Sequence, residues 1–168
     1  DRFERAIART PLPIEEQDLT EGARDLLSAY WAEHLSREQG AHLSFAMINR
    51  LVDYMIRSNT YVRGALQVTY PVVFLDEFQD TTYPQYDFLV NAFEGSRAVF
   101  TAVGDNKQRI MGWAGALPDA FEAFTNDFLA REVTLLCNWR SHEGLVSIQR
   151  VLALDIDPDV EDVEAQGA

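Results

Sequence analysis

The chain has 168 residues, a length that suits one domain or parts of two. Apolar residues make up 47% of it, including 10 Phe, 6 Tyr and 3 Trp, so it can build a packed core and wholesale disorder is excluded. One cysteine excludes an internal disulfide, and we expect neither a secretory leader nor a membrane span. The composition therefore predicts a soluble, cytoplasmic protein with no membrane partner.

The charge is strongly acidic, with 27 Asp and Glu against 14 Lys and Arg and a formal net charge of −13. Proteins that bind nucleic-acid phosphates usually carry a basic patch, so this chain alone is expected to bind nucleic acid weakly. Part of the acidic excess gathers near the end, at Asp155, Asp157, Asp159, Glu161, Asp162 and Glu164. Such a run predicts a solvated, flexible tail.

The first third of the chain predicts two amphipathic helices after an irregular lead-in at residues 1–20. Thr20 is suited to cap the first helix and Ser44 the second, and a shorter helix is expected after Thr60. The apolar positions of the first helix are Ala23, Leu26, Leu27, Tyr30, Trp31, His34 and Leu35. The expected inner face of the second consists of Phe45, Ile48, Leu51, Val52 and Met55.

From Pro71 onward, short apolar strands alternate with helices. Residues 72–75 predict a strand buried on both faces of a parallel sheet, and residues 98–103 and 133–136 predict two more strands. The expected helices start near Pro84 and stop at Gly95, lie around residues 118–128, and run from a Ser141 cap to about Leu154. This order predicts an α/β fold with a parallel sheet.

A polar cluster follows each of the three predicted strands, at residues 76–80, 104–108 and 138–141. Ligands of parallel α/β sheets bind beyond the carboxyl ends of the strands. We therefore expect the three clusters to converge on one edge of the sheet and to face one cleft, with Gln108 nearer than Arg140 to the acidic pair Asp76 and Glu77.

That acidic pair has the form of a Walker B element. A carboxylate at Asp76 can hold Mg²⁺, directly or through water, and Glu77 can orient and deprotonate an attacking water. Taken alone, the pair is explained equally well by Asp76 capping the turn after the strand.

Three longer strings resemble, in order and spacing, motifs II, III and IV of the UvrD/Rep family of superfamily 1 helicases. They are VVFLDEFQDTTYPQY at 72–86, AVGDNKQRIMGWAGA at 102–116 and LLCNWRSHEGLV at 135–146, and the resemblance extends over about residues 43–152. It implies part of a RecA-like P-loop NTPase parallel sheet with helices, preceded by a helical subdomain segment. ATP and Mg²⁺ would be the cofactors, and single-stranded DNA the partner of the whole protein.

The resemblance also implies a division of the chain. Residues 1–66 would end an inserted helical subdomain, 67–137 would be the second part of the first motor domain, and 138–168 would cross to the second motor domain with an acidic flexible tail. The whole protein would couple ATP hydrolysis to translocation on single-stranded DNA and to duplex unwinding in repair, replication or recombination. The family includes helicases that are linked to nucleases.

For the ATP site, the resemblance implies that Asp76 serves the magnesium and that Glu77 is the catalytic base. Gln108 would sense the γ-phosphate, and Arg140 would bring positive charge to the transferring phosphoryl group. Trp139, where the family usually has Tyr, could stack on the adenine.

Four further residues are implied around motifs II and III. Gln79 would lie at the nucleotide and, with Asp80, would link motif II to motif III. Asp80 and Asp105 would couple ATP hydrolysis to movement on DNA. On the DNA side, Trp113 would stack on a base.

Motif III departs from the family at Met111, where Tyr is usual, and at Ala114, where Arg is usual. Both changes weaken the expected hold on DNA, and Arg109 could compensate by contacting phosphate. Trp113 and Trp139 are alternatively explained as side chains that fill a core.

The sequence contains no G-x-x-x-x-G-K-[ST] phosphate loop, so the chain alone is expected to be inactive. Two other functions remain open: a degenerate, non-hydrolysing nucleotide- or DNA-binding module, and an acidic protein-interaction domain on an ATPase-like scaffold.

The three histidines lack metal-ligand spacing, so structural roles are expected for His34, His42 and His142. Cys137 is expected to be a buried small hydrophobe.

Overall fold

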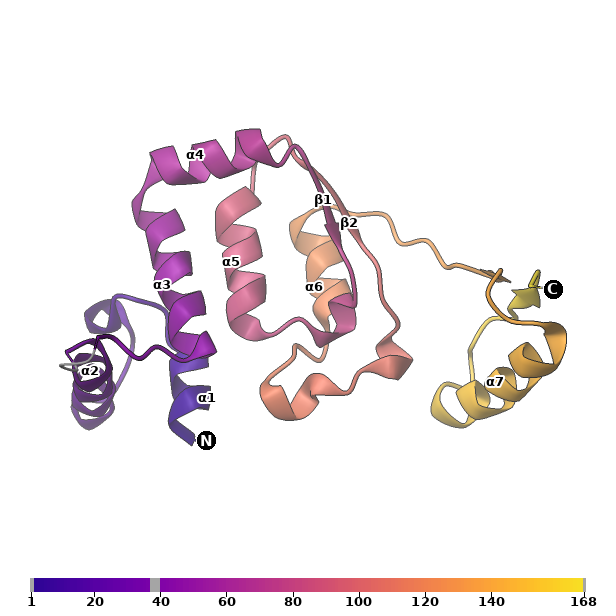
Figure 1. Ribbon diagram of the computed structural model, residues 1–168, viewed down its shortest axis with the longest axis horizontal. Coiled ribbons are helices and arrows are strands. Elements are labelled where there is room, and N and C mark those ends of the chain that lie inside the picture. The colour runs from indigo at the N-terminus through magenta and orange to yellow at the C-terminus, as the bar shows by residue number, and fades with distance from the viewer. Residues whose placement is uncertain (1, 37–39, 168) are drawn as a thin grey trace.

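The computed structural model describes residues 2–36 and 40–167, which form a mixed α/β structure with short parallel strands (Figure 1). Within the described residues, four α-helices precede the first strand: α1 (Arg2–Arg9), α2 (Glu21–Leu35), α3 (Phe45–Ser58) and α4 (Thr60–Thr69). The prediction of an irregular lead-in was wrong for α1, which packs against α3 and buries Ile7. Pro11 and Pro13 lie beyond Arg9, so they follow the helix and do not prevent it.

The predicted caps of the next two helices are confirmed. The Thr20 hydroxyl accepts a hydrogen bond from the Ala23 N–H (3.4 Å), and the Ser44 hydroxyl accepts one from the Met47 N–H (3.3 Å). Asn59 caps α4, the short helix predicted after Thr60, through two main-chain N–H groups of the first turn. Short polar side chains thus begin all three helices.

The predicted inner face of α3 was wrong except for Leu51, which packs against the core that contains Ile7 and Met47. Phe45 is 86% exposed and Met55 is 54% exposed. The buried side chains of α3 are Met47, Arg50, Asp53 and Ile56. Two of these are charged and find partners on neighbouring elements, so the pattern of apolar residues alone selected the wrong side of the helix.

The sheet of the central part pairs β1 (Val72–Leu75) with β2 (Val99–Ala102) in parallel. Two helices, α5 (Tyr83–Phe93) and α6 (Ala120–Asp127), lie beside it (Figure 1). Alternate strand residues pack on the core that these helices share, namely Val73, Leu75, Phe100 and Ala102. The other side of the strands is open, with Phe74 73% exposed. The prediction of a strand buried on both faces was therefore wrong for the described residues.

An aromatic cluster fixes the chain where it leaves β1. Phe78 is 2% exposed, and its ring packs edge-on against Phe121 and Phe124 at centroid distances of 5.4 and 5.2 Å. The Tyr86 hydroxyl donates to Asp127 Oδ2 at 2.7 Å, which joins α5 to α6. Burial, followed by the bond to Asp127 and its charge, raises the pKa of Tyr86. This core holds the segment that follows Asp76 and Glu77.

The C-terminal part forms a separate unit, which Figure 1 shows apart from the β1–β2 sheet. It contains β3 (Cys137–Asn138), α7 (Glu143–Ile156) and β4 (Glu164–Ala165), and β3 pairs in parallel with β4. The predicted strand at 133–136 is not a strand, and Val133 and Leu135 are 69% and 76% exposed. Without a neighbouring strand to pair with, this apolar run stays an extended connection.

Two smaller predictions for this unit were also wrong. His142 caps α7, its Nδ1 accepting from the Gly144 N–H at 2.9 Å, one residue after the expected Ser141. Cys137 is exposed on β3 and is not the buried small hydrophobe that was predicted. The acidic side chains of the tail are exposed except for the partly buried Asp157, which agrees with the predicted solvation. Residues Glu164–Ala165 pair with β3 as β4, and Asp162 pairs with Arg150. Among the helices of the described residues, each is too short or too polar to cross a membrane.

Candidate functional site

Asp76 and Glu77 follow β1 at a sharp turn. Glu77 has a left-handed backbone with φ +49°, a conformation that costs a non-glycine residue about 1–3 kcal/mol. Asp76 Oδ1 accepts the Glu77 N–H at 2.9 Å, so the turn-capping contact considered from the sequence is present. The turn sends Phe78 into the core and leaves both carboxylates exposed at the strand end.

Gln79 joins this turn to the end of β2. Its side chain is buried, with the residue 1% exposed, and both ends of its amide are used. Nε2 donates to Glu77 Oε2 at 2.7 Å, and Oε1 accepts from the Asp105 N–H at 3.0 Å. Gly104 makes the approach possible, because a Cβ placed there would lie 2.1 Å from Gln79 Oε1.

Asp80 makes a second connection between the same segments. Its Oδ1 accepts the N–H groups of Ile110 (3.2 Å) and Met111 (3.0 Å). Main-chain bonds from Phe78 N–H to the Val103 carbonyl (3.0 Å) and from Leu117 N–H to the Thr81 carbonyl (2.9 Å) run alongside. Residues 78–83 and 103–117 are therefore held together by both side chains and main chain.

Asp105 organises the second polar cluster. Its carboxylate accepts the Lys107 N–H at 2.9 Å and the Gln108 Nε2 at 3.1 Å. Gln108 is exposed and follows the carboxyl end of β2, the parallel neighbour of the strand that ends before Asp76 and Glu77. The prediction that Asp76, Glu77 and Gln108 share one edge of a parallel sheet is confirmed.

The third cluster lies elsewhere, so the prediction of three clusters on one edge was wrong. Asn138 Oδ1 accepts the N–H groups of Arg140 and Ser141, each at 2.9 Å, in the turn after β3. Because β3 pairs with β4, this turn belongs to the C-terminal unit and not to the β1–β2 edge (Figure 1). Arg140 and Trp139 are exposed there.

The loop after Asp105 presents an indole to solvent. Trp113 is 74% exposed on the short 3-10 turn Met111–Ala114, and Trp139 is 75% exposed. The alternative that these two residues fill a core was therefore wrong for the described residues. Arg109 Nη1 donates to the Pro118 carbonyl at 2.8 Å, so part of its guanidinium is already engaged.

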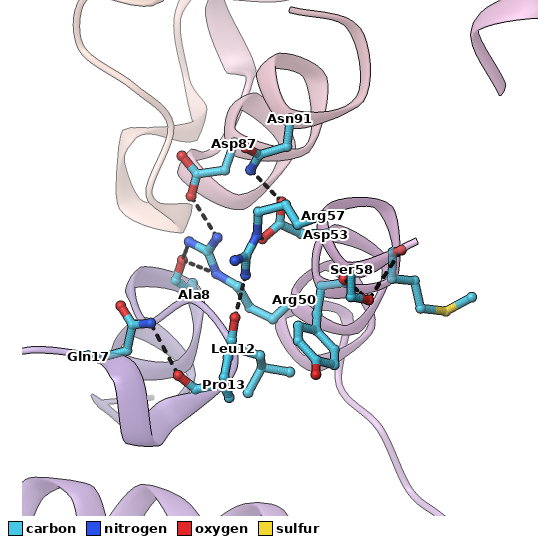
Figure 2. A network of polar contacts seen from close by, with 12 residues as sticks. Ala8, Leu12, Pro13, Gln17, Arg50, Asp53, Arg57, Ser58, Asp87 and Asn91 are labelled. Carbon is cyan, nitrogen blue, oxygen red and sulfur yellow. Dashed lines mark hydrogen bonds and ion pairs between the residues drawn. The ribbon is translucent and has the colours of Figure 1, made fainter. Parts of the chain in front are cut away.

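A buried polar network on the other side of α5 was missed from the sequence (Figure 2). Arg50 Nη1 contacts Asp87 Oδ2 at 2.6 Å, and Arg50 Nε donates to the Ala8 carbonyl at 3.0 Å. Asp53 accepts from Asn91 Nδ2 at 2.7 Å and from Arg57 Nε at 3.1 Å. The available signal was spacing: residues 50, 53 and 57 recur on one side of α3, and residues 87 and 91 on one side of α5.

No group of three or more His, Cys, Asp or Glu side chains able to hold a metal occurs in the part of the chain that the structure describes. His34 Nδ1 instead contacts the Tyr30 carbonyl at 2.8 Å, and His142 caps α7.

Residues 6–129 match the family model described as UvrD/REP helicase N-terminal domain. This stretch contains the first two polar clusters and ends before Asn138. The chain is 36% identical over 111 residues to ATP-dependent DNA helicase Rep of Escherichia coli (66% of this chain, 16% of that protein). It is 34% identical over 134 residues to RecBCD enzyme subunit RecB of Mycolicibacterium smegmatis (77% and 12%). It is also 26% identical over 124 residues to DNA helicase II of Haemophilus influenzae (74% and 17%). The chain thus spans less than a fifth of the length of these relatives.

Proposed function

The chain belongs to the UvrD/REP helicase family, and we propose that it is an interior part of an ATP-dependent DNA helicase that carries motifs II, III and IV. The observation that supports this most is the pairing of the two strand ends, where Gln79 and Asp80 connect the acidic pair to the loop that carries Trp113. Residues 67–137 would then belong to a RecA-like motor domain, residues 1–66 to the helical subdomain before it, and 138–168 to the crossing into the second motor domain.

Glu77 would act as the general base for the water that attacks ATP. Its carboxylate is exposed at the strand end and held by the Gln79 amide. Gln79 is buried and both ends of its amide are bonded within the chain, so it would act at the nucleotide edge through Glu77, while Gln108 would face the transferred phosphate.

The carboxylates after β1 are suited to bind magnesium together with the phosphates of ATP. Mg²⁺ is commonly bound by one or two carboxylates together with substrate phosphates, so a group of three protein ligands is not required. The exposed Asp76 carboxylate, which uses Oδ1 to fix the turn, is suited to this part. When bound, the ion would neutralise charge on the phosphates of ATP.

Arg140 and Trp139 would complete the ATP site from the C-terminal unit. Their exposure leaves the guanidinium and the indole accessible to a nucleotide, provided that this unit approaches the strand ends. Trp113 would stack on single-stranded DNA, with Met111 and Arg109 beside it, and Asp80 and Asp105 would couple hydrolysis to translocation and unwinding.

The test uses the complete protein that contains this chain. We expect ATP hydrolysis that single-stranded DNA stimulates, and a loss of kcat by about 10²- to 10⁴-fold in Glu77→Gln, the usual contribution of a general base. KM for ATP should change by less than about threefold, because the substitution keeps the shape of the side chain. Glu94→Gln, the same change at an exposed carboxylate just after α5, is the matched control and should leave kcat unchanged. Full turnover by Glu77→Gln would reject this function.

A further inference from the structure

Gln79 is the side chain that physically joins the proposed base to the second strand end. We propose that Gln79 is a positioning residue that holds the Glu77 carboxylate and makes its position depend on the segment 104–108, so that DNA bound near Trp113 stimulates hydrolysis through it. The inference rests on the proposed function, since it takes Glu77 as the base.

The geometry leaves the Gln79 amide little freedom. Its two bonds, 2.7 Å to Glu77 and 3.0 Å from the Asp105 N–H, lie at opposite ends of one planar group. Hydrogen bonds weaken steeply when their angle or length departs from these values. A displacement of the Asp105 N–H must therefore move the amide and the Glu77 carboxylate with it, or break one of the two bonds.

The surroundings of the amide are equally restricted. Gln79 is 1% exposed, and the neighbouring Phe78 N–H is bonded to the Val103 carbonyl. The absent Cβ of Gly104 is what leaves room for Gln79 Oε1. Asparagine carries the same amide on a side chain one methylene shorter, so its amide could not reach both partners, and an ionised glutamate would offer no donor to Glu77.

The same segment continues into the DNA-facing loop. Asp105 is followed by Ile110 and Met111, whose N–H groups are held by Asp80, and then by the exposed Trp113. If this loop shifts when DNA binds, its hydrogen bonds to Asp80 and Gln79 would transmit the displacement to the acidic turn. Only Gln79 touches the carboxylate of Glu77 among the hydrogen bonds of the described side chains. The rate of the chemical step should therefore depend on Gln79.

The experiment measures ATP hydrolysis by the complete protein with and without single-stranded DNA. Gln79→Met keeps the length of the side chain and removes both hydrogen bonds. We expect the DNA-stimulated kcat to fall about 10- to 100-fold, the scale of a misplaced catalytic group. KM for ATP and Kd for a labelled oligonucleotide should each change by less than about threefold.

The matched control is Gln67→Met. Gln67 donates to the Ala92 carbonyl at 2.7 Å, so this variant loses a side-chain bond of similar length that lies away from the strand ends. It should leave the DNA-stimulated kcat unchanged. A second variant, Gln79→Asn, keeps an amide in the buried site but cannot bridge, and it should show the same loss of kcat as Gln79→Met.

Glu77→Gln, measured in parallel, separates the two hypotheses. If Glu77→Gln is inactive and both Gln79 variants keep their stimulated kcat, Gln79 is not a positioning residue and the proposed function stands. If Glu77→Gln turns over normally, the proposed function fails and this inference fails with it. Loss of the fold in both Gln79 variants, or equal changes in kcat and KM, would assign Gln79 to the core and overturn the inference.

Discussion

Trp113 and Trp139 provide a comparison between two indoles of almost equal exposure, 74% and 75%. Trp113 lies on the loop after β2, and Trp139 follows β3 in the C-terminal unit. The proposed function assigns the first to DNA and the second to the adenine of ATP. The same substitution at the two positions should therefore affect different ligands.

In the complete protein, Trp113→Ala should weaken the affinity for single-stranded DNA by roughly 5- to 150-fold, because a base stacked on an aromatic contributes about 1–3 kcal/mol. It should also uncouple ATP turnover from DNA. Trp139→Ala should leave the DNA affinity unchanged and raise KM for ATP. Fluorescence anisotropy with a labelled oligonucleotide measures the first effect. An unchanged affinity and salt dependence for Trp113→Ala would remove this residue from the DNA site.

At the scale of single residues, the sequence predicts which side chains lie at the edge of the sheet better than it predicts the hydrogen bonds between them. Apolar strands ending in Asp76 and Gly104 are sufficient to bring Glu77 and Gln108 to one edge of a parallel sheet. The contact between Gln79 and Glu77 depends on a left-handed turn at Glu77 and on the approach of two strand ends. The family resemblance implied that Gln79 links the two motifs, but the left-handed turn at Glu77 and the bond from Gln79 to the Glu77 carboxylate were not predicted. The close approach that the bond needs leaves a sign in the sequence at Gly104.

At the scale of elements, the wrong predictions for α3 and for residues 133–136 depend on neighbouring elements that a local sequence pattern does not reveal. The side of α3 that is buried carries Arg50 and Asp53, because α1 and α5 supply their partners. Residues 133–136 have the composition of a strand, but a strand requires a neighbour to take its hydrogen bonds. The caps at Thr20 and Ser44 were predictable because the bonds that they make are local.

The Arg50 network should contribute strongly to the stability of the helical part. Arg50→Met is expected to lower the free energy of unfolding by about 2–3 kcal/mol, since it removes a 1% exposed guanidinium and leaves the Ala8 carbonyl without its donor. Arg150→Met is the matched control. It breaks an ion pair whose side chains are 53% and 65% exposed and should cost at most about 1 kcal/mol. Urea denaturation of both variants gives the comparison, and equal midpoints would show that the network contributes little.

At the scale of the whole molecule, the proposed ATP site would be only partly contained in this chain. The 168-residue chain has no phosphate loop, and positioning of the phosphates supplies most of phosphoryl-transfer catalysis. We expect the purified chain to hydrolyse ATP no faster than background in a phosphate-release assay with magnesium. Turnover that requires magnesium and disappears in Glu77→Gln would contradict this expectation and show that the chain is sufficient for catalysis.

The contact between Lys107 and Asp157 has a consequence for how the C-terminal unit is held. The two charged atoms are 3.6 Å apart, and their side chains are 31% and 43% exposed. An exposed ion pair contributes about 0.2–1 kcal/mol, which favours the arrangement that contains it by a population ratio of roughly 1.4 to 5. Of the residues of α7, Val146 alone is buried, so packing adds little to this ratio. The unit that carries Arg140 is therefore expected to exchange between orientations. Because salt screens the ion pair at Lys107, the populations of these orientations should shift with ionic strength.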